Sequence, residues 1–535
     1  MIGRDGIRGW WRDDAQGASL WPILVLAGIL ALALVLPAQA VVARYVNDLL
    51  IFLDGAYRVN HGQVPNRDFH TALGPLNFYL PALAARLTGT LGTAMPVSMA
   101  LLIAALAPAM AHIVSSRLRP VLGIPFAAFL LLIIAMPANL GEAITDLSYG
   151  MFYNRIGWAA LAALILMHLR PTVIRPRQGL LDTLAASLLV VTMIYTKASY
   201  GAVGAGFLVL MLLDRRQRAW ALAALGVVLA TGLAVEAVWR GGAGHIADLR
   251  AAMVVSGNRT PVELTDFFLR NLADYVLLAL VAIPSLWRTR SPRDALLYGF
   301  CAGAGLMLIS QNFQGWGIIT IHAGAVVAAE RLMRTMTPED VLAPVSMAGA
   351  APILMLALIL PTIVHATATL ALSTTLSAAR AGEPFGLRNY EGARLAFVWN
   401  PGDAAANGRY LATLREGVGL LTRMDPPPHG VFTLDFVNPF SSAANLAPPQ
   451  GDTAWQHWGR NVNEYAFVPP DELFRAIEVV MEPKAAIEGV TGDNLRQIYG
   501  AYLAENYALA EETGDWRVFR RNPPDRPAAN AMLRR

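Results

Sequence analysis

The chain has 535 residues, of which 55% are hydrophobic and only 15% are charged, against roughly 25% charged residues in ordinary soluble domains. Its mean hydropathy is +0.44 and its formal net charge is +4. This composition excludes a soluble globular enzyme, a disordered chain and a protein that binds nucleic acid through a basic face. The single cysteine, Cys301, excludes an internal disulfide bond and a metal site built from cysteines.

Apolar blocks near the ~20 residues that a transmembrane helix needs recur along the first two thirds of the chain. We predict eleven spanning helices, at 20–42, 95–114, 121–137, 156–169, 179–196, 199–213, 219–238, 270–287, 295–310, 315–329 and 343–365. The first block has no cleavage site followed by a polar start, so we expect a span there and not a cleaved signal peptide. The sequence thus predicts an N-terminal tail, 1–19, and a polytopic α-helical membrane domain, 20–365.

Arginine indicates how these helices are oriented. The short loops on one side of the predicted membrane are rich in it, as in Arg215-Arg216-Gln217-Arg218 and Arg288-Thr289-Arg290, whereas the long loops on the other side contain few basic residues. The positive-inside rule therefore places the N-terminus in the cytoplasm. Eleven spans then leave the C-terminus and the long loops 43–92, 138–155 and 239–270 on the outer side.

The first outer loop, 43–92, contains the strongest motif. It reads Asn47-Asp48, then a helix-period stretch over 49–60, then a turn over 62–70 and a second helix-period stretch over 76–87. We predict two amphipathic helices that lie in the plane of the membrane interface. Asp48 follows the first span directly, where an acid is costly unless it is hydrated or paired. It is a candidate functional carboxylate, with a helix cap as the structural alternative.

Together with the topology, this loop resembles the polytopic type-C glycosyltransferases (GT-C fold), in the branch of protein mannosyltransferases and lipid A aminoarabinose transferases. Asp48 matches the acidic residue that follows the first span in that family. The motifs G-x-x-P-Y-x-D-F and P-P-L-Y-Y are matched by Gly62, Pro65, Asp68 and Phe69 and by Pro75, Leu76 and Tyr79. The family often has an acidic pair after the first span, but here Leu49 follows Asp48 and Asn47 precedes it.

The resemblance implies an enzyme of the bacterial inner membrane that transfers a hexosyl or pentosyl group from a polyprenyl-phosphate donor to an acceptor at the periplasmic face. A single displacement inverts the anomeric centre, so one carboxylate suffices as general base. Asp48 is the first candidate for this base and Asp68 the second. No metal or other cofactor is implied, although Asp48 and Asp68 together could hold a divalent cation. The sugar stays open, as does the acceptor, which is a glycan, a lipid or a protein.

Three cations are candidates for binding the donor phosphate. Lys197 forms the connection between the fifth and sixth spans, in a chain with only two lysines. Arg155 begins the fourth span, and Arg67 precedes Asp68. Each has a structural alternative: snorkelling for Lys197, anchoring at the interface for Arg155, and an ion pair with Asp68 for Arg67.

Polar and aromatic side chains of the outer loops are candidates for binding the acceptor. Their structural alternative is a solvated loop position or an interface anchor. They are His70, Glu142, Asp146, Tyr149, Tyr153, Gln311 and Asn312, and Gln314 lies in the same polar turn as the last two.

The last segment, 366–535, contains no span and predicts a soluble periplasmic α/β domain. Strand-like residues 392–399, a helix over 409–422 and a strand over 430–436 predict a βαβ unit. Further strands are expected at 477–481 and 516–520, with a helix over 494–509 between them. Such a domain could select the acceptor or cover a cavity.

Two other classes of function compete with the enzyme. One is a transporter or flippase of a lipid-linked saccharide, and the other is a non-catalytic assembly protein of the envelope. Transporters typically contain pseudo-symmetric halves and interrupted helices, and the sequence contains neither pattern. The long first outer loop is also unnecessary for transport, so the sequence favours the enzyme.

Overall fold

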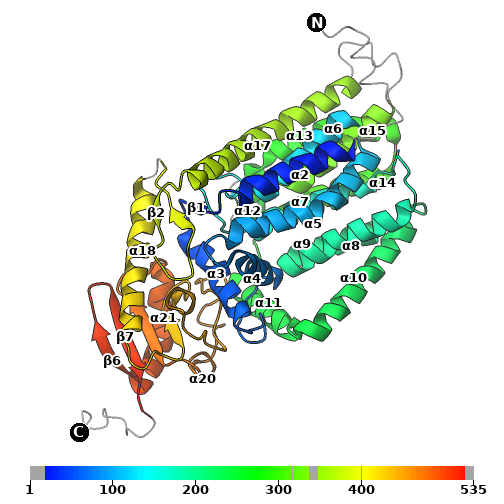
Figure 1. Ribbon diagram of the computed structural model, residues 1–535. Coiled ribbons are helices and arrows are strands. Elements are labelled where there is room, and N and C mark those ends of the chain that lie inside the picture. The colour runs from blue at the N-terminus through cyan, green and yellow to red at the C-terminus, as the bar shows by residue number, and fades with distance from the viewer. Residues whose placement is uncertain (1–18, 312–313, 315–316, 336–346, 399–400, 524–535) are drawn as a thin grey trace.

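The computed structural model describes residues 19–311, 314, 317–335, 347–398 and 401–523 (Figure 1). A bundle of long helices makes up most of the molecule. The C-terminal domain lies at one end of this bundle. We call this end the domain end.

Each predicted span overlaps a helix, and residues 315–316 and 343–346 of the last two predicted spans lie outside the described residues. The bundle helices are α2 (Leu20–Val35), α5 (Ala94–Arg117), α6 (Pro120–Ala135), α7 (Phe152–Ile165) with the short η1 (Leu166–His168), α8 (Gln178–Thr196), α9 (Ala198–Met211), α10 (Arg218–Trp239), α13 (Leu272–Thr289), α14 (Pro292–Ser310), α15 (Ile319–Arg334) and α17 (Met347–Ala378). Among the described residues, α5, α8, α10, α13 and α17 are long and apolar enough to cross a membrane. The number of spans stays a prediction.

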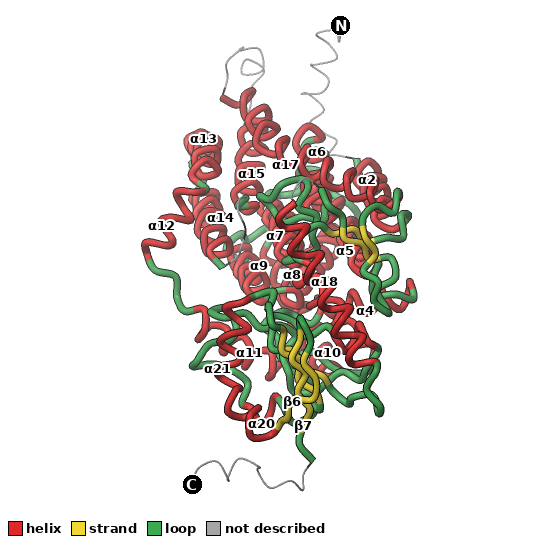
Figure 2. Tube along the Cα trace, turned by 90° about the vertical axis from the view of Figure 1, so that its left-hand side faces the viewer, coloured by secondary structure: helices red, strands yellow, loops and turns green. Residues whose placement is uncertain are grey.

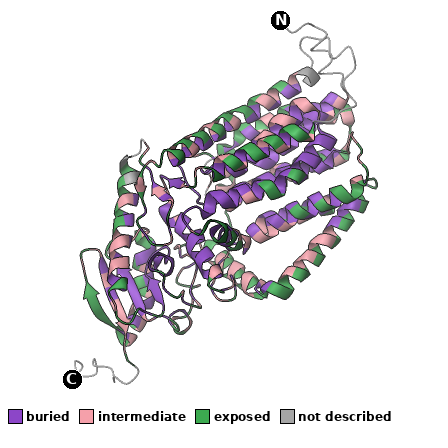
Figure 3. Ribbon diagram, in the orientation of Figure 1, coloured by how far each residue is buried: buried purple, intermediate pink, exposed green. Residues whose placement is uncertain are grey.

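Burial separates inner from outer helices of the bundle (Figure 3). Nearly all of α7 and α15 is buried, whereas α10 leaves Leu222, Leu229 and Leu233 about two thirds exposed. A monomeric soluble protein rarely leaves so many apolar side chains on one exposed face. The outer surface of the bundle is therefore the surface of a membrane protein.

The first predicted span is too long at its C-terminal end. Helix α2 stops at Val35 because Pro37 cannot continue the helical hydrogen bonds. Residues 40–42, which were expected to be helical, instead form strand β1 (Ala40–Val42). At the other end of the bundle domain, α17 continues past the predicted boundary at residue 365 as far as Ala378.

Both helices predicted in the first outer loop are present, as α3 (Val46–Asn60) and α4 (Leu76–Thr88). Helix α3 packs against α4 and against α19 (Phe440–Ala444) of the C-terminal domain. Almost all of its residues are buried. Its apolar side meets protein and not lipid, because Phe52 packs against Phe78 of α4 and Phe152 of α7. The C-terminal domain contacts the same helix through Asp54 and Arg58.

A buried ion-pair network fixes α3 to the C-terminal domain. The fully buried guanidinium of Arg58 contacts Asp54 at 2.7 Å and both carboxylate oxygens of Asp452, at 2.5 and 2.8 Å. The hydroxyl of Ser442 donates to Asp54 at 3.0 Å. Removing one partner from a buried pair costs roughly 3–5 kcal/mol, so this junction holds the first outer loop and the domain in one arrangement.

Two further helices, α11 (Gly242–Ser256) and α12 (Pro261–Arg270), occupy the third outer loop. Helix α12 begins with a capping box, in which Thr260 and Glu263 exchange hydrogen bonds. Helix α11 approaches the first outer loop at Gly244, where a Cβ atom would lie 1.8 Å from the carbonyl oxygen of Asn66. Only glycine permits this close approach.

The C-terminal domain contributes strands to two sheets. In the smaller, β3 (Ala393–Leu395) lies between β1 and β2 (Glu383–Pro384). The larger has the order β4-β5-β7-β6, with β4 (Val431–Thr433), β5 (Val479–Pro483), β7 (Trp516–Arg521) and β6 (Tyr507–Glu512). Figure 2 shows β6 and β7 side by side. Helices α18 (Pro401–Thr422), α20 (Pro470–Leu473) and α21 (Gly489–Asn506) complete the domain.

The predicted βαβ unit is wrong. Strand β3 runs parallel to β1 of the membrane half, whereas β4 runs parallel to β5. Helix α18 therefore connects two different sheets. Strand β6 was expected to be the end of a helix, but it pairs with β7. Tertiary pairing decides the state of such short apolar runs, and local pattern does not reveal the partner.

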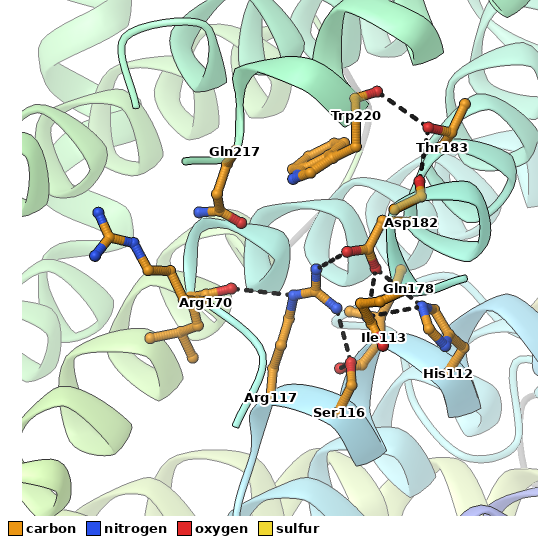
Figure 4. A network of polar contacts seen from close by, with 12 residues as sticks. His112, Ile113, Ser116, Arg117, Arg170, Gln178, Asp182, Thr183, Gln217 and Trp220 are labelled. Carbon is orange, nitrogen blue, oxygen red and sulfur yellow. Dashed lines mark hydrogen bonds and ion pairs between the residues drawn. The ribbon is translucent and has the colours of Figure 1, made fainter. Parts of the chain in front are cut away.

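A cluster of paired charges lies at the opposite end of the bundle, which we call the arginine end. Figure 4 shows part of this cluster from close by. Arg117 of α5 contacts Asp182 of α8 at 2.9 Å, and His112 contacts the other oxygen of Asp182 at the same distance. Arg334 donates to the carbonyl oxygens of Arg117 and Arg170 at 2.5 and 3.1 Å. This end holds arginines from the short loops that the sequence placed in the cytoplasm.

Candidate active site

A cavity of about 500 Å³ opens at the domain end. It is bounded by the start of α3, the second outer loop, α12 and a loop of the C-terminal domain. Its polar and aromatic lining comes from Arg44, Tyr45, Asn47, Asp48, Phe52, Glu142, Tyr153, Phe267, Arg270, Gln314, Phe436, Trp455, His457, Arg460 and Glu488.

Asp48 lies in the first turn of α3 and lines this cavity. Its side chain is half-buried, and no hydrogen bond or ion pair reaches its carboxylate from the described residues. Burial raises the pKa of Asp48 to about 7; Arg460 opposes this shift, and the charges of Glu488 and Glu142 add to it. A carboxylate with this pKa can both release and accept a proton near neutral pH.

Gly150 of the second outer loop sets the space around Asp48. A Cβ atom on Gly150 would lie 2.7 Å from Oδ2 of Asp48 and 3.2 Å from its Cβ. No ordinary side chain fits there unless the carboxylate moves. The glycine therefore places the backbone of one outer loop directly against the carboxylate of the other.

Lys197 lies between α8 and α9. Its ammonium donates to Oδ1 of Asn154 at 3.1 Å and lies 5.3 Å from the ring centroid of Tyr153, which lines the cavity. Burial and then the charge of Arg460 lower the pKa of Lys197 to about 7. Arg460 thus acts electrostatically on both Asp48, which lines the cavity, and Lys197, which is not part of the lining.

Arg460 and Glu488 were missed by the sequence analysis. They come from the C-terminal domain, far along the chain from Asp48, and no motif marks them. A signal was nevertheless present, because the run from Trp455 to Arg460 combines two tryptophans, a histidine and an arginine in six residues. Such a polar and aromatic run in a loop is typical of a binding site.

The second outer loop contributes unequally to the cavity. Glu142 lines it and accepts a hydrogen bond from the hydroxyl of Tyr45 at 2.9 Å. Asp146 instead pairs with Arg44 at 2.9 Å, and Tyr149 is fully buried outside the cavity lining. The roles predicted for Asp146 and Tyr149 in binding the acceptor are not supported by their positions.

Arg155 is almost fully buried in α7, and none of its three guanidinium nitrogens has a hydrogen-bond partner among the described residues. It does not line the cavity. Buried polar groups are nearly always paired, so this guanidinium is an unusual feature beside the site. Its predicted contact with a phosphate stays a prediction.

Arg67 and Asp68 lie away from the cavity. They pair with each other at 3.0 Å near the surface, and Asp68 also accepts a hydrogen bond from the backbone of Val64. The structure therefore does not bring Asp68 together with Asp48, either as a second base or as half of a metal site. No group of three His, Cys, Asp or Glu residues that could hold a metal is present in the described part of the chain.

The remaining candidates fall in different places. His70 lines a second cavity that includes Trp455 of the first. Gln311 is exposed at the end of α14, outside the lining of the first cavity, and Asn312 lies outside the described residues. Gln314 from the same turn does line the first cavity.

No family model matches the chain, and no curated protein matches its sequence. Among solved structures, the chain is similar to ArnT from Cupriavidus metallidurans bound to undecaprenyl phosphate, at 12% identity over 93% of this chain and 97% of that chain, with a TM-score of 0.48. It is also similar to the oligosaccharyltransferase of Archaeoglobus fulgidus in complex with Zn and sulfate, at 12% identity over 86% of this chain and 68% of that chain, with a TM-score of 0.37.

The apo state of the same ArnT gives a TM-score of 0.47 at 13% identity, over 93% of this chain and 97% of that chain. Likenesses of this size do not identify a reaction.

Proposed function

We propose that the protein is a glycosyltransferase of the bacterial inner membrane that takes a sugar from a polyprenyl-phosphate donor at the periplasmic face. One observation carries the proposal. Asp48 is a half-buried carboxylate without a hydrogen bond or ion pair among the described residues. It faces a cavity that is also lined by the guanidinium side chain of Arg460, which acts on its pKa. A carboxylate held in this way is costly for stability and suited to proton transfer.

Asp48 acts as the general base in this proposal. The acceptor oxygen attacks the anomeric carbon while the bond from that carbon to the phosphate oxygen breaks. The proton of the acceptor moves to the carboxylate of Asp48, and the phosphate leaves on the polyprenyl lipid. The pKa of about 7 for Asp48 suits this role, because a base is most effective when its pKa lies near the working pH.

Lys197 and Arg460 stabilise the leaving phosphate. Arg460 lines the cavity, and Lys197 contacts Tyr153 of its wall. A phosphate bound between them raises the pKa of Lys197 and so keeps its ammonium charged. Preorganised cations of this kind are the main source of rate enhancement where negative charge develops on a leaving group.

The position of the cavity suits a lipid donor. It lies where the helices of the bundle meet the C-terminal domain, so a polyprenyl chain can follow the exposed apolar surface of the bundle while its phosphate enters the cavity. In this proposal the C-terminal domain is periplasmic and the arginine end is cytoplasmic. The acceptor enters from the side of the domain.

The test uses purified protein, a radiolabelled undecaprenyl-phosphate pentose or hexose, and a cell-envelope extract as the pool of acceptors. We expect Asp48→Asn to slow the release of undecaprenyl phosphate by about 10²–10⁴-fold, the range for loss of a general base. Binding of undecaprenyl phosphate itself should be unchanged. Asp493→Asn, at an exposed carboxylate of the C-terminal domain, is the matched control.

Full release by Asp48→Asn would overturn the assignment of the base. Movement of the labelled donor across a proteoliposome without release of undecaprenyl phosphate would indicate a flippase instead.

A further inference from the structure

A second cavity, of about 270 Å³, lies between the first outer loop, α11 and the C-terminal domain. Trp455 lines both this cavity and the cavity of Asp48. The two cavities are thus neighbours that share one aromatic wall. A volume of this size is near the lower end of the range for small-molecule sites, and it suits one small, polar group.

Backbone hydrogen bonds build the walls of this second cavity. The amide of His70 donates to the carbonyl of Asp452 at 2.8 Å, and the amide of Ala454 donates to the carbonyl of His70 at 2.9 Å. The carboxylate of Asp248 on α11 accepts from the amide of Thr71 at 2.9 Å and contacts Nδ1 of His70 at 2.8 Å. These contacts join three distant segments, so the cavity is preformed.

Several polar side chains that line the second cavity have atoms without a hydrogen-bond partner among the described residues. Gln456 is 3% exposed, and its Oε1 has no hydrogen-bond partner among the described residues. The hydroxyl of Thr453 and the indole nitrogen of Trp455 are likewise buried without a partner within the described chain. An unpaired buried group of this kind costs about 1–3 kcal/mol, and all three belong to residues that line the second cavity.

The remaining lining indicates which ligand chemistry fits. Glu472 is partly exposed and lies 3.4 Å from Nε2 of His70, so the cavity offers a carboxylate and an imidazole side by side. Trp455 and the exposed ring of Phe467 add aromatic surface. Hydroxyl groups bind strongly to carboxylates, and the weakly positive C–H face of a sugar ring packs on the negative face of an aromatic ring.

We propose that this second cavity binds a saccharide unit of the acceptor. The inference rests on the proposed function, and it narrows the acceptor from any hydroxyl-bearing molecule to one that contains a sugar. The bound unit packs against Trp455, and the nucleophilic hydroxyl extends past this side chain to Asp48. Under this proposal His70, Gln456 and Glu472 determine acceptor specificity and take no part in proton transfer.

The test measures binding of simple saccharides to the full-length protein in lipid nanodiscs by saturation-transfer difference NMR. The probes are methyl α-glucopyranoside, N-acetylglucosamine and maltose at millimolar concentration. We expect at least one of them to bind. Gln456→Leu and Glu472→Gln should each weaken that binding by tenfold or more, whereas Glu511→Gln, at a distant surface carboxylate, should leave it unchanged.

Asp48→Asn separates the two proposals, because it should abolish transfer and leave saccharide binding intact. If no saccharide binds to the wild-type protein, or if binding survives both Gln456→Leu and Glu472→Gln, the acceptor site is elsewhere and this inference fails, whatever the outcome for Asp48. Glu472 is partly exposed, so its variant keeps the test valid even if Gln456→Leu does not fold.

Discussion

The two ends of the bundle differ in how their buried carboxylates are paired. At the arginine end, Asp182 is contacted by Arg117, by His112 and by Gln178, all within 3.0 Å. At the domain end, Asp48 faces a cavity and receives no such contact from the described residues. Paired charges are typical of structural roles, and a perturbed carboxylate in a cavity is typical of a functional one.

The same contrast extends to the neighbouring cations. Arg293 and Arg170 both reach Asp214, at 2.5 and 3.1 Å, and so their charges are balanced within the protein. Arg460 lines the cavity and lowers the pKa of Asp48 and of Lys197. The difference teaches that the number of arginines at each end says little about function, because what matters is the group on which each guanidinium acts.

The largest expected effect on activity comes from Asp48→Asn, described above, which should abolish transfer without a loss of stability. Asp182→Asn, at the arginine end, should lower stability without a loss of activity. It leaves the buried guanidinium of Arg117 without its counter-charge, and breaking a buried pair costs about 3–5 kcal/mol. We expect a marked fall in thermal stability in detergent, with transfer activity per folded molecule unchanged.

Asp493→Asn again serves as the control for removal of one carboxylate. Equal thermal stability of Asp182→Asn and wild type would show that the cluster at the arginine end is not structural. Lower activity per folded molecule would show that the two ends are coupled.

The pH dependence of transfer tests the domain end directly. Activity should rise with pH as Asp48 loses its proton near pH 7 and fall as Lys197 loses its proton near the same value, which gives a narrow bell in kcat/KM. Arg460 lowers both pKa values, so Arg460→Gln should raise both and move the bell to higher pH. It should also slow transfer by about 10²-fold, as for other lost electrostatic donors.

Arg475→Gln, at an exposed arginine of the same domain, is the matched control for this shift. An unshifted pH profile for Arg460→Gln would show that Arg460 does not act on the groups that titrate in the site. A wild-type profile without the acidic limb would show that Asp48 is not the general base.

Gly150→Ala should have a smaller effect on the same end. The added Cβ would lie 2.7 Å from Oδ2 of Asp48, so the carboxylate must turn away from its position. Misplacing a catalytic group by about 1 Å costs up to ~10²-fold in rate, and we expect kcat to fall about tenfold or more with little change in the KM for the donor. Gly226→Ala, on a helical glycine with open space around it, is the control.

The sequence located the helices and the central carboxylate, because both depend on local pattern. Long apolar runs predict helices whatever their partners, and Asp48 stands out by its place beside an apolar block. Glu142, Tyr153 and Lys197 were also singled out from the loops. The structure places Glu142 and Tyr153 in the lining of the cavity of Asp48, and Lys197 lies against Tyr153.

The missed features all depend on contacts between distant segments. Strand β1 has three residues and its partner β3 lies more than 300 residues away along the chain, so no local pattern could pair them. Arg460 reaches the cavity because the C-terminal domain is fixed to α3 through Arg58 and Asp452. Arg67 and Asp68 satisfied a motif, but their side chains turn toward each other, which spacing does not reveal.

Arg67→Ala should have the smallest effect on transfer and on stability. It tests the contrast with a paired cation that lies outside the cavity of Asp48. Arg67 is about half-exposed and pairs with its neighbour Asp68, and exposed pairs contribute less than about 1 kcal/mol. If the structure places Arg67 correctly, transfer rate and donor KM stay at wild-type values and thermal stability hardly changes. A tenfold rise in donor KM would instead give Arg67 the phosphate-binding role that its sequence position predicted. The cavity of Asp48 would then have to extend to the surface of the first outer loop when the donor binds.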